Sequence, residues 1–302
     1  MTDAPLAIIG DALIDEIHHE DGSVAEFVGG AALNVAVGLS ILGIPTTLIA
    51  MVGDDADGDR IREYLSGRGV GLIGTPAPYG SSRGISTRVN GEPRYVFNAA
   101  AQNRAIEFGA EVRAAIDAAP YVVTSCFPFD DAAQTAALRA AVARSAERFI
   151  VDPNPRTSMM HDTGAFRAAI DDLAADTLLL KIGEEDSALL YDLPLESATA
   201  HLLNLGAGCV LATAGAEGAS VHTPHGTMAR EPIAELPGPI VDTMGAGDAT
   251  LAAVVADIVR RGHLPADAAA WSAALRHAML IAAATCRGTG ALLRVPRENS
   301  PR

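Results

Sequence analysis

The chain has 302 residues, of which 49% are hydrophobic and 20% are charged, and its formal net charge is −15. The apolar content is enough for a sizeable core and excludes a disordered chain, while the acidic charge argues against nucleic acid or a membrane surface as the main partner. We expect neither a signal peptide nor a membrane span. The widely spaced Cys126, Cys209 and Cys286 are expected to be buried free thiols of a cytoplasmic protein.

The first predicted strand is Leu6–Gly10, a short apolar run that ends in glycine. Such a run is typical of a buried strand in a parallel sheet. Ligands of α/β sheets collect beyond the carboxyl ends of the strands. We therefore expect Asp11, which follows directly, to meet a substrate, with Asp15 as a second candidate. A turn aspartate that binds its own backbone is the alternative for Asp11.

The next segment predicts a helix over about Leu33–Leu42, with small residues on one side and Gly43 as its cap. Gly29 and Gly30 at its start allow a ligand to approach the backbone. Asn34 in the first turn directs a donor and an acceptor toward the same opening. Close helix packing alone explains the small residues well but explains Asn34 less well.

A second strand is predicted over Pro45–Val52, and an acidic turn at 53–58 leads into a helix that ends near Leu65. The acidic turn could indicate calcium. It lacks the ligand spacing and the closing glutamate of an EF-hand loop, so we expect it to cap the helix instead.

Two hairpins are predicted to stand off the main sheet. Residues 13–28 alternate weakly about a turn at Asp21-Gly22. Between Ile85–Val89 and Arg94–Phe97 lies Asn90-Gly91, the strongest short hairpin signal. Together they could cover a substrate opening as a lid. Because two-stranded pieces are marginal in water, we expect this layer to pack on something, plausibly a second subunit of a homodimer.

From Glu111 onward, helical stretches alternate with short apolar runs, a pattern of βαβ units with right-handed crossovers. The predicted strands are Tyr121–Thr124, Arg148–Asp152, Thr177–Ile182 and Cys209–Thr213, and the predicted helices are Ala132–Ala146, Thr163–Ala174 and, at the end of the chain, most of Leu264–Ala284.

Three of these strand ends carry polar residues or glycines. Asp152-Pro-Asn-Pro-Arg156 closes one strand, and Lys181-Ile-Gly-Glu-Glu-Asp186 closes the next. Lys181 is the only lysine of the chain, which makes it a candidate functional residue; chance survival in an arginine-biased composition is the alternative. The acids at 184–186 could hold a divalent cation through water, or could be solvated acids at a helix start. Thr213–Gly218 is a third, glycine-punctuated strand end.

The segment Val241–Thr250 has glycines at 245 and 247 around Ala246, followed by Asp248. The apolar run after it predicts a buried helix, so the glycines lie at a helix start, where free N–H groups and the helix dipole bind an anion. Asp248 would repel that anion and is better placed to take a proton from the group that attacks it. An anion cradle with a base is what phosphoryl transfer to a hydroxyl needs. A glycine-rich turn with Asp248 as a dipole partner is the alternative.

Five segments together resemble a known family. Asp242–Asp248 and Gly29–Asn34 resemble the two signatures of the ribokinase-like (PfkB) sugar kinases, about two hundred residues apart. Gly10–Asp15, Val52–Gly58 and Asp152–Arg156 resemble the fructokinase branch. The resemblance covers nearly the whole chain in the right order, which makes it far more specific than either glycine motif alone.

The resemblance implies one three-layer α/β/α domain, residues 1–302, with a mainly parallel central sheet and a small β-sheet lid formed by about 13–28 and 84–104. It implies transfer of the ATP γ-phosphate to a sugar hydroxyl. Asp248 matches the catalytic base of the family. The matching anion hole consists of Gly245, Ala246 and Gly247.

The resemblance also implies the binding positions. Those for the sugar are Asp11, Gly29, Gly30 and Asn34, to which we add Asp15, Asn98 and Arg156 as candidates. Those around ATP are Thr213, Gly215 and Gly218, with Lys181 and Gly247 as further candidates. A monovalent-cation site, which would favour K⁺ as an activator, is matched by Asp242 and the backbone of 286–291.

Two departures from the family pattern bear on the ligands. Many members have Asn-x-x-Glu after the Lys181 strand, linked to magnesium, where this chain has Gly183 and Asp186. Mg²⁺ dependence is still expected because ATP brings the metal, and Asp186 can act through a water. Branches that phosphorylate 2-keto-3-deoxygluconate place an arginine near Asn98, which pairs the sugar carboxylate.

Asn98 suits a neutral sugar better, although Arg88, Arg94 or Arg104 could supply that cation. The sequence therefore predicts an ATP-dependent sugar kinase, with fructose as the preferred substrate. Ribokinase, 2-keto-3-deoxygluconate kinase, a nucleoside kinase or a regulatory sugar- or nucleotide-binding protein without turnover remain alternatives.

Overall fold

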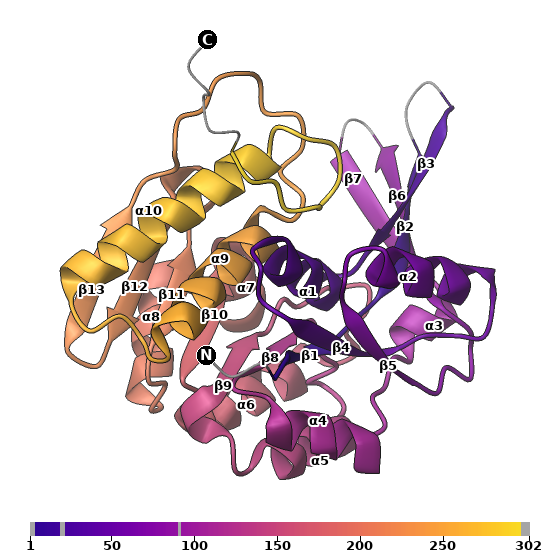
Figure 1. The fold of residues 1–302 in the computed structure, drawn as a ribbon, viewed down its shortest axis with the longest axis horizontal. Coiled ribbons are helices and arrows are strands. Elements are labelled where there is room, and N and C mark those ends of the chain that lie inside the picture. Colours follow the sequence, from indigo (N-terminus) through magenta and orange to yellow (C-terminus); the bar gives the residue numbers. More distant parts are fainter. Residues whose placement is uncertain (1–3, 19–21, 90–91, 297–302) are drawn as a thin grey trace.

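The computed structural model describes residues 4–18, 22–89 and 92–296. Nine strands of this part form the central sheet, in the order β13-β12-β11-β10-β9-β8-β1-β4-β5 (Figure 1). Neighbours are parallel from β5 to β11, and β12 and β13 are antiparallel at one edge. The strands are Leu6–Gly10 (β1), Thr46–Met51 (β4), Gly71–Thr75 (β5), Val122–Ser125 (β8), Phe149–Asp152 (β9), Leu179–Gly183 (β10), Val210–Thr213 (β11), Ala219–Thr223 (β12) and Gly226–Glu231 (β13).

Helices cover both faces of this sheet, so the predicted mainly parallel α/β/α architecture is confirmed. One core contains side chains of α1, α2, α9 and α10, and the other contains side chains of α4 to α8. The helices are Ala31–Ile41 (α1), Ala56–Ser66 (α2), Ala99–Gln102 (α3), Ala110–Ala118 (α4), Ala132–Val142 (α5), Thr163–Leu173 (α6), Glu184–Tyr191 (α7), Leu195–Asn204 (α8), Ala246–Arg261 (α9) and Ala268–Thr285 (α10), with single 3₁₀ turns at Ala146–Arg148 (η1), Ala174–Asp176 (η2) and Gly215–Glu217 (η3).

The strand β1 shows why its sequence is an uninterrupted apolar run. Leu6 and Ile8 point into the first core, whereas Ala7 and Ile9 point into the second. Successive side chains of a strand face opposite sides of the sheet, so a strand with helices on both faces needs apolar residues at every position.

Four further strands form a separate small sheet in the order β3-β2-β6-β7, which stands off the main sheet (Figure 1). They are Leu13–His18 (β2), Val24–Gly29 (β3), Ser82–Val89 (β6) and Glu92–Phe97 (β7). The two predicted hairpins are confirmed, and they are joined through parallel pairing of β2 with β6. The predicted turns include Asp21, Asn90 and Gly91, which lie outside the described residues.

Local capping follows the predicted chemistry. Asp55 is the N-cap of α2, and its side chain accepts a hydrogen bond of 2.8 Å from the N–H of Gly58. Gly43 follows α1 with φ 79° and donates its N–H to the carbonyl of Ser40. The expected helix cap and the expected glycine stop are therefore both confirmed.

The sequence pattern missed β5 and β13. Two glycines, Gly71 and Gly74, interrupt β5 and weaken its strand signal. The structure tolerates them because β5 is an edge strand that pairs only with β4. All three cysteines are buried and free, as predicted. Within the described ranges, no helix combines the length and apolar character needed to cross a membrane.

Candidate active site

The carboxyl ends of neighbouring strands bring polar residues to one edge of the central sheet. In the register, Gly10 of β1 lies beside Ser125 of β8, and Ser125 lies beside Asp152 of β9. Lys181 lies on the next strand, β10. The helices α1 and α9 pack against each other, and their first turns supply Asn34 and Asp248. Residues more than two hundred positions apart thus meet at this edge.

Asp248 lies in the first turn of α9 with 7% of its surface exposed. Gly245, the residue before the helix, has φ 75° and ψ 1°, a left-handed conformation that favours glycine. A Cβ at this position would lie 2.5 Å from the carbonyl oxygen of Ala291. Conformation and close approach therefore both require the glycine. The turn combines a helix start, whose N–H groups lack helical partners, with a buried carboxylate.

Two asparagines hold the carboxylate of Asp248. The Nδ2 of Asn34 donates to Oδ2 at 2.9 Å, and the Nδ2 of Asn154 donates to Oδ1 at 3.5 Å. Burial first, and the charge of Asp152 second, raise the pKa of Asp248 from 3.8 to about 6, against the hydrogen bond from Asn34. Asn154 was not predicted as a site residue. The polar strand end 152–156 was its only signal in the sequence.

Lys181 and Asp152 form a buried ion pair beside this carboxylate. The Nζ of Lys181 lies 2.8 Å from Oδ1 of Asp152, and Ser125 donates its hydroxyl to Oδ2 of Asp152 at 3.0 Å. Burial would lower the pKa of Lys181, but the nearby charges of Asp152 and Asp186 raise it above the ordinary value, so the ammonium is charged. A Cβ at Gly247 would lie 3.6 Å from Nζ. The only lysine therefore lies against the first turn of α9, whereas its partner Asp152 was not predicted.

Asp11 is 7% exposed and caps α1, because its Oδ1 accepts the N–H of Ala32 at 3.0 Å. Its carbonyl oxygen accepts the N–H of Leu33 at 3.2 Å. A Cβ at Gly30 would lie 2.8 Å from that oxygen. Burial raises the pKa of Asp11. Asp11 therefore lies beyond β1 as predicted, and its carboxylate bonds the start of α1 rather than its own local backbone.

Asp15 lies on β2 of the small sheet, and a Cβ at Gly29 would lie 2.3 Å from its Oδ2. Among the described residues its carboxylate makes no hydrogen bond or ion pair. Burial first, and the charge of Asp11 second, raise its pKa to about 7. Asp248 also contributes to this shift, so the small sheet and the main sheet bring three carboxylates within electrostatic reach of each other.

Asn98 is the N-cap of α3, and backbone groups occupy most of its side chain. Its Oδ1 accepts the N–H groups of Arg83 at 3.0 Å and Ala101 at 2.9 Å, and its Nδ2 donates to the carbonyl of Ser81 at 2.9 Å. One amide hydrogen remains for a ligand. The predicted contact of Asn98 with the sugar therefore competes with a role at the base of the small sheet.

The arginines near the site differ in their contacts. Arg104 is 8% exposed and donates to the carbonyls of Ala101, Cys126 and Met159. The side chain of Arg156 reaches solvent although protein surrounds much of it, and its guanidinium makes no hydrogen bond or ion pair within the described residues. Although burial opposes it, the surrounding negative charges, including Asp248 and Asp11, raise the pKa of Arg156. Arg156 is thus a free cation beside the carboxylates. The side chains of Arg88 and Arg94 lie outside the described part.

The predicted nucleotide residues gather at the ends of β10 and β11. Gly215, with φ 48°, begins the turn η3 after Thr213, and Gly218, with φ 96°, follows that turn. A Cβ at Gly183 would lie 3.3 Å from the hydroxyl oxygen of Thr213 and 3.2 Å from Oδ2 of Asp186. That Oδ2 accepts the N–H of Gly183 at 2.7 Å. Gly183 therefore fits closely between a hydroxyl and a carboxylate, where a larger side chain would crowd both.

Comparison of the sequence with known protein families agrees with this geometry. The model of the pfkB family of carbohydrate kinases matches residues 4–297. The chain belongs to this family. It is 31% identical over 268 residues to a fructokinase of Rhizobium leguminosarum bv. trifolii, covering 82% of this chain and 78% of that one. The two signature segments that carried the resemblance are therefore those of a true family member.

Two solved structures share the fold of this pfkB protein. Aminoimidazole riboside kinase from Salmonella enterica, complexed with aminoimidazole riboside and an ATP analogue, matches with a TM-score of 0.78 and 24% identity, covering 95% of each chain. Fructokinase from Vibrio cholerae O395, in a form with bound fructose, ADP and calcium ion, matches with a TM-score of 0.78 and 20% identity, covering 96% of this chain and 94% of that one. Both confirm the ribokinase-like fold.

The predicted monovalent-cation segment of this pfkB protein is closed by backbone contacts. The Oδ1 of Asp242 accepts the N–H of Met244 and its Oδ2 accepts that of Gly290, each at 3.0 Å. The N–H groups of Val241 and Asp242 donate to the carbonyl of Cys286. Each carboxylate oxygen keeps a second lone pair, so the donor set fits a cation that prefers oxygen ligands.

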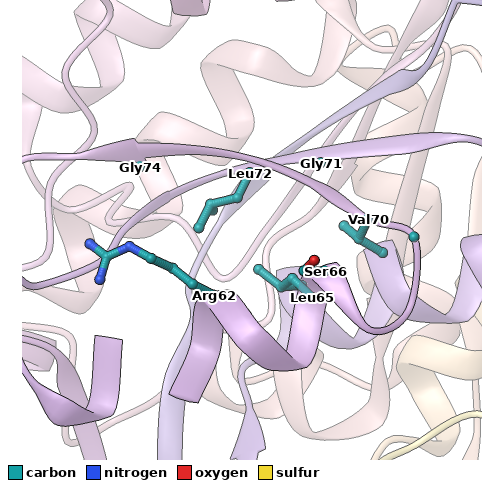
Figure 2. Close-up of a pocket in the computed structure, with 8 residues that line it drawn as sticks. Arg62, Leu65, Ser66, Val70, Gly71, Leu72 and Gly74 are labelled. Atoms are coloured by element: carbon teal, nitrogen blue, oxygen red, sulfur yellow. The ribbon is translucent and has the colours of Figure 1, made fainter. Parts of the chain in front are cut away.

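A groove on the described surface lies away from this site. It lies between α2 and the edge strand β5 (Figure 2). Its volume is about 500 Å³. Arg62 is its one charged lining residue, beside Leu65, Val70, Leu72 and small residues. It contains none of the predicted site residues. Within the described residues, no cluster of three His, Cys, Asp or Glu side chains could hold a metal ion by itself.

Proposed function

We propose that this pfkB family member is a fructokinase, which transfers the γ-phosphate of ATP to a hydroxyl of fructose. The observation that carries the proposal is the buried carboxylate of Asp248 at the glycine-formed start of α9, with the ammonium of Lys181 beside it. The fructokinase relative, at 31% identity over most of the chain, supports the choice of sugar.

In this reaction Asp248 accepts the proton of the attacking hydroxyl while the oxygen–phosphorus bond forms and the bond to the ADP oxygen breaks. Asn34 fixes one of its oxygens at 2.9 Å and Asn154 lies 3.5 Å from the other, so the base is already oriented for the transfer. The N–H groups of the 245–247 turn, together with Lys181, stabilise the charge of the transferring phosphoryl group. A pKa of about 6 keeps Asp248 ionised at neutral pH and still a competent base.

Asp11 and Asp15 accept hydrogen bonds from sugar hydroxyls, and Asn34 and Arg156 complete the acceptor site. The small sheet acts as a lid that excludes water, so ATP is not hydrolysed in place of transfer. Three carboxylates around the acceptor site favour a neutral sugar over an acid sugar, since an anionic substrate would be repelled.

Thr213, Gly215 and Gly218 would line the nucleotide site. Mg²⁺, bound with ATP, would neutralise phosphate charge, and Asp186 would hold it through a water, because Mg²⁺ keeps several of its waters when it binds. Asp242 and the backbone of 286–291 would hold K⁺ as an activator. We place the reaction in the cytoplasm, where ATP is available and free buried thiols persist.

A homodimer through the small sheet is part of the proposal. Val24 and Val96 on its strands are 53% and 60% exposed, and a second copy would cover such apolar side chains. Sedimentation of the purified chain tests this point, because a monomer at micromolar concentration would contradict it.

The experiment that tests the function is ADP release from Mg-ATP with K⁺, across fructose, ribose, 2-keto-3-deoxygluconate, tagatose and adenosine. A strong response to fructose alone supports the proposal. A response only to an acid sugar or a nucleoside keeps Asp248 as the base and rejects fructose. No ADP release with any of the five compounds, while the protein still binds ATP, would contradict the proposed activity.

A further inference from the structure

An ion-pair network joins the small sheet to helix α2, outside the site described above. At its centre is Arg83, the second residue of β6. Its Nε and Nη2 donate to the two carboxylate oxygens of Asp57 at 2.7 and 2.9 Å. Its Nη1 lies 2.5 Å from Glu16 and 2.7 Å from Glu26. One guanidinium therefore ties strands β6, β2 and β3 to a helix of the main body.

A second arginine closes the network from the side of the helix. Arg60 of α2 lies 2.7 Å from Glu26 and 3.4 Å from Asp57. The side chains of Arg83, Asp57 and Glu16 are only 26%, 20% and 19% exposed. Solvent and salt screen such partly buried pairs less than exposed ones. The fork of Arg83 on Asp57 also fixes direction, because a bidentate pair holds one relative orientation.

The same strands direct their other face to the acceptor site. Arg83 binds Asp57 of α2, and Glu16 binds Arg83 on the same face of the sheet. The adjacent residues Asp15 and Gly84, which pair with each other in the register, therefore lie on the opposite face. A Cβ at Gly84 would lie 3.4 Å from Oδ1 of Asp15, and one at Gly29 would lie 2.3 Å from its Oδ2. The side chain of Asp15 thus lies between two glycines, on the face of the small sheet opposite the ion pairs of Arg83.

Hydrogen bonds join the base of the small sheet to the N-terminus of α2. Ser81, next to β6, donates its N–H and its hydroxyl to the carboxylate of Asp55 at 2.7 and 2.6 Å. Its hydroxyl oxygen accepts the N–H of Gly53 at 3.1 Å. These hydrogen bonds fix where the sheet begins, and the strands β2, β3 and β6 extend beyond them. The Arg83 network acts on those strands.

We propose that Arg83 is a positioning residue that, through Asp57 and Glu16, holds the small sheet at the angle at which Asp15 reaches the acceptor sugar. The proposal rests on the proposed sugar kinase function of the site. Arg83 acts on sugar binding and on water exclusion, not on the chemical step or on ATP.

The test compares Arg83→Met with Arg62→Met. Arg62 is a matched control, because it lies on the same helix and, among the described residues, forms ion pairs only with the exposed Asp54 and Asp59. We expect Arg83→Met to raise the KM for the sugar about ten- to a hundredfold, the range that a displaced binding group causes. The KM for ATP stays unchanged, and ATP hydrolysis without sugar rises. Arg83→Lys, which keeps the charge without the fork, gives an intermediate KM. The Arg62→Met variant behaves as wild type.

Hydrogen–deuterium exchange without substrates gives a readout that needs no activity. Arg83→Met is expected to speed exchange in β2, β3 and β6 but not in the central sheet. If Arg83→Met fails to fold, Asp57→Asn removes the same fork from the helix side. Unchanged exchange in the small sheet, or faster exchange with an unchanged sugar KM, overturns the proposal. If the wild type phosphorylates no sugar, the proposed function fails, whereas the exchange result still decides whether Arg83 holds the sheet.

Discussion

At the scale of single residues, Asp248 carries the proposed chemistry. Replacing it by asparagine keeps the shape of the site but removes the base, together with one of the two oxygens that accept from Asn34 and Asn154. We expect Asp248→Asn to fold normally and to lower kcat by about 10²- to 10⁴-fold, the usual contribution of a general base. Steady-state ADP release with fructose measures this, with circular dichroism as the folding control. Turnover near that of the wild type would reject the role of Asp248.

The pKa of Asp248 predicts the acid side of the pH profile. The base works only when ionised, and its pKa in the folded protein is raised from 3.8 to about 6. Activity should therefore fall tenfold per pH unit below about pH 6. Asp15, with a pKa of about 7, should weaken sugar binding as it protonates. The pH dependence of kcat/KM for the sugar checks this, and a profile flat down to pH 4.5 would contradict it.

The sequence predicted Asp248, Asn34 and Asp11, because each lies in a short motif or directly after a strand. It could not predict the pairing of Lys181 with Asp152. These residues are 29 positions apart, and they meet only because β9 and β10 are neighbours in the sheet. Asn154 was missed for the same reason, since its partner lies on α9.

At the scale of elements, the turn before α9 depends on Gly245. We expect Gly245→Ala to destabilise the fold by about 1–3 kcal/mol and to lower activity, because the added Cβ overlaps Ala291 and displaces the first turn. Gly262 at the other end of α9 is a matched control. Its φ and ψ are 78° and 2°, and a Cβ there meets nothing within 4 Å.

Thermal unfolding and ADP release of the two variants measure the difference. Both alanines carry the same backbone strain, so the extra loss in Gly245→Ala reports the overlap alone. Equal losses in the two variants would show that the contact with Ala291 is unimportant.

Elements with a clear pattern of hydrophobic residues could be predicted from the sequence. Elements that are stabilised mainly by neighbouring strands or helices could not. The strand β1 and the helix α9 have long apolar runs, whereas β5 contains two glycines and exists because β4 supplies its partner. The small sheet was predicted as two hairpins. The pairing of β2 with β6 and the ion pairs between the small sheet and α2 are tertiary contacts. No local sequence pattern predicts them.

At the scale of the whole molecule, buried carboxylates link stability to pH. Asp248 binds its proton more tightly in the folded chain than at the ordinary pKa of 3.8. As pH rises from about 4 to about 6, the unfolded chain therefore ionises first, and the free energy of unfolding falls. This contribution amounts to at most about 3 kcal/mol.

Asp248→Asn lacks that contribution. It should be more stable than the wild type at pH 8 and similar to it at pH 4. Urea unfolding of both proteins at the two pH values checks this, and a variant that is less stable at pH 8 would contradict it. This result would show that the buried carboxylate of the active site lowers the free energy of unfolding at neutral pH.

The buried lysine of β10 has a practical consequence. A lysine-specific protease has only one cutting point in these 302 residues, and that point is 4% exposed in the middle of the central sheet. A short pulse of such a protease therefore cuts only molecules whose sheet has opened. The fraction cut in urea, with and without a nucleotide or a sugar, would report ligand affinity through the shift in unfolding midpoint. Cleavage at this single lysine would therefore measure ligand binding without any need for enzymatic turnover.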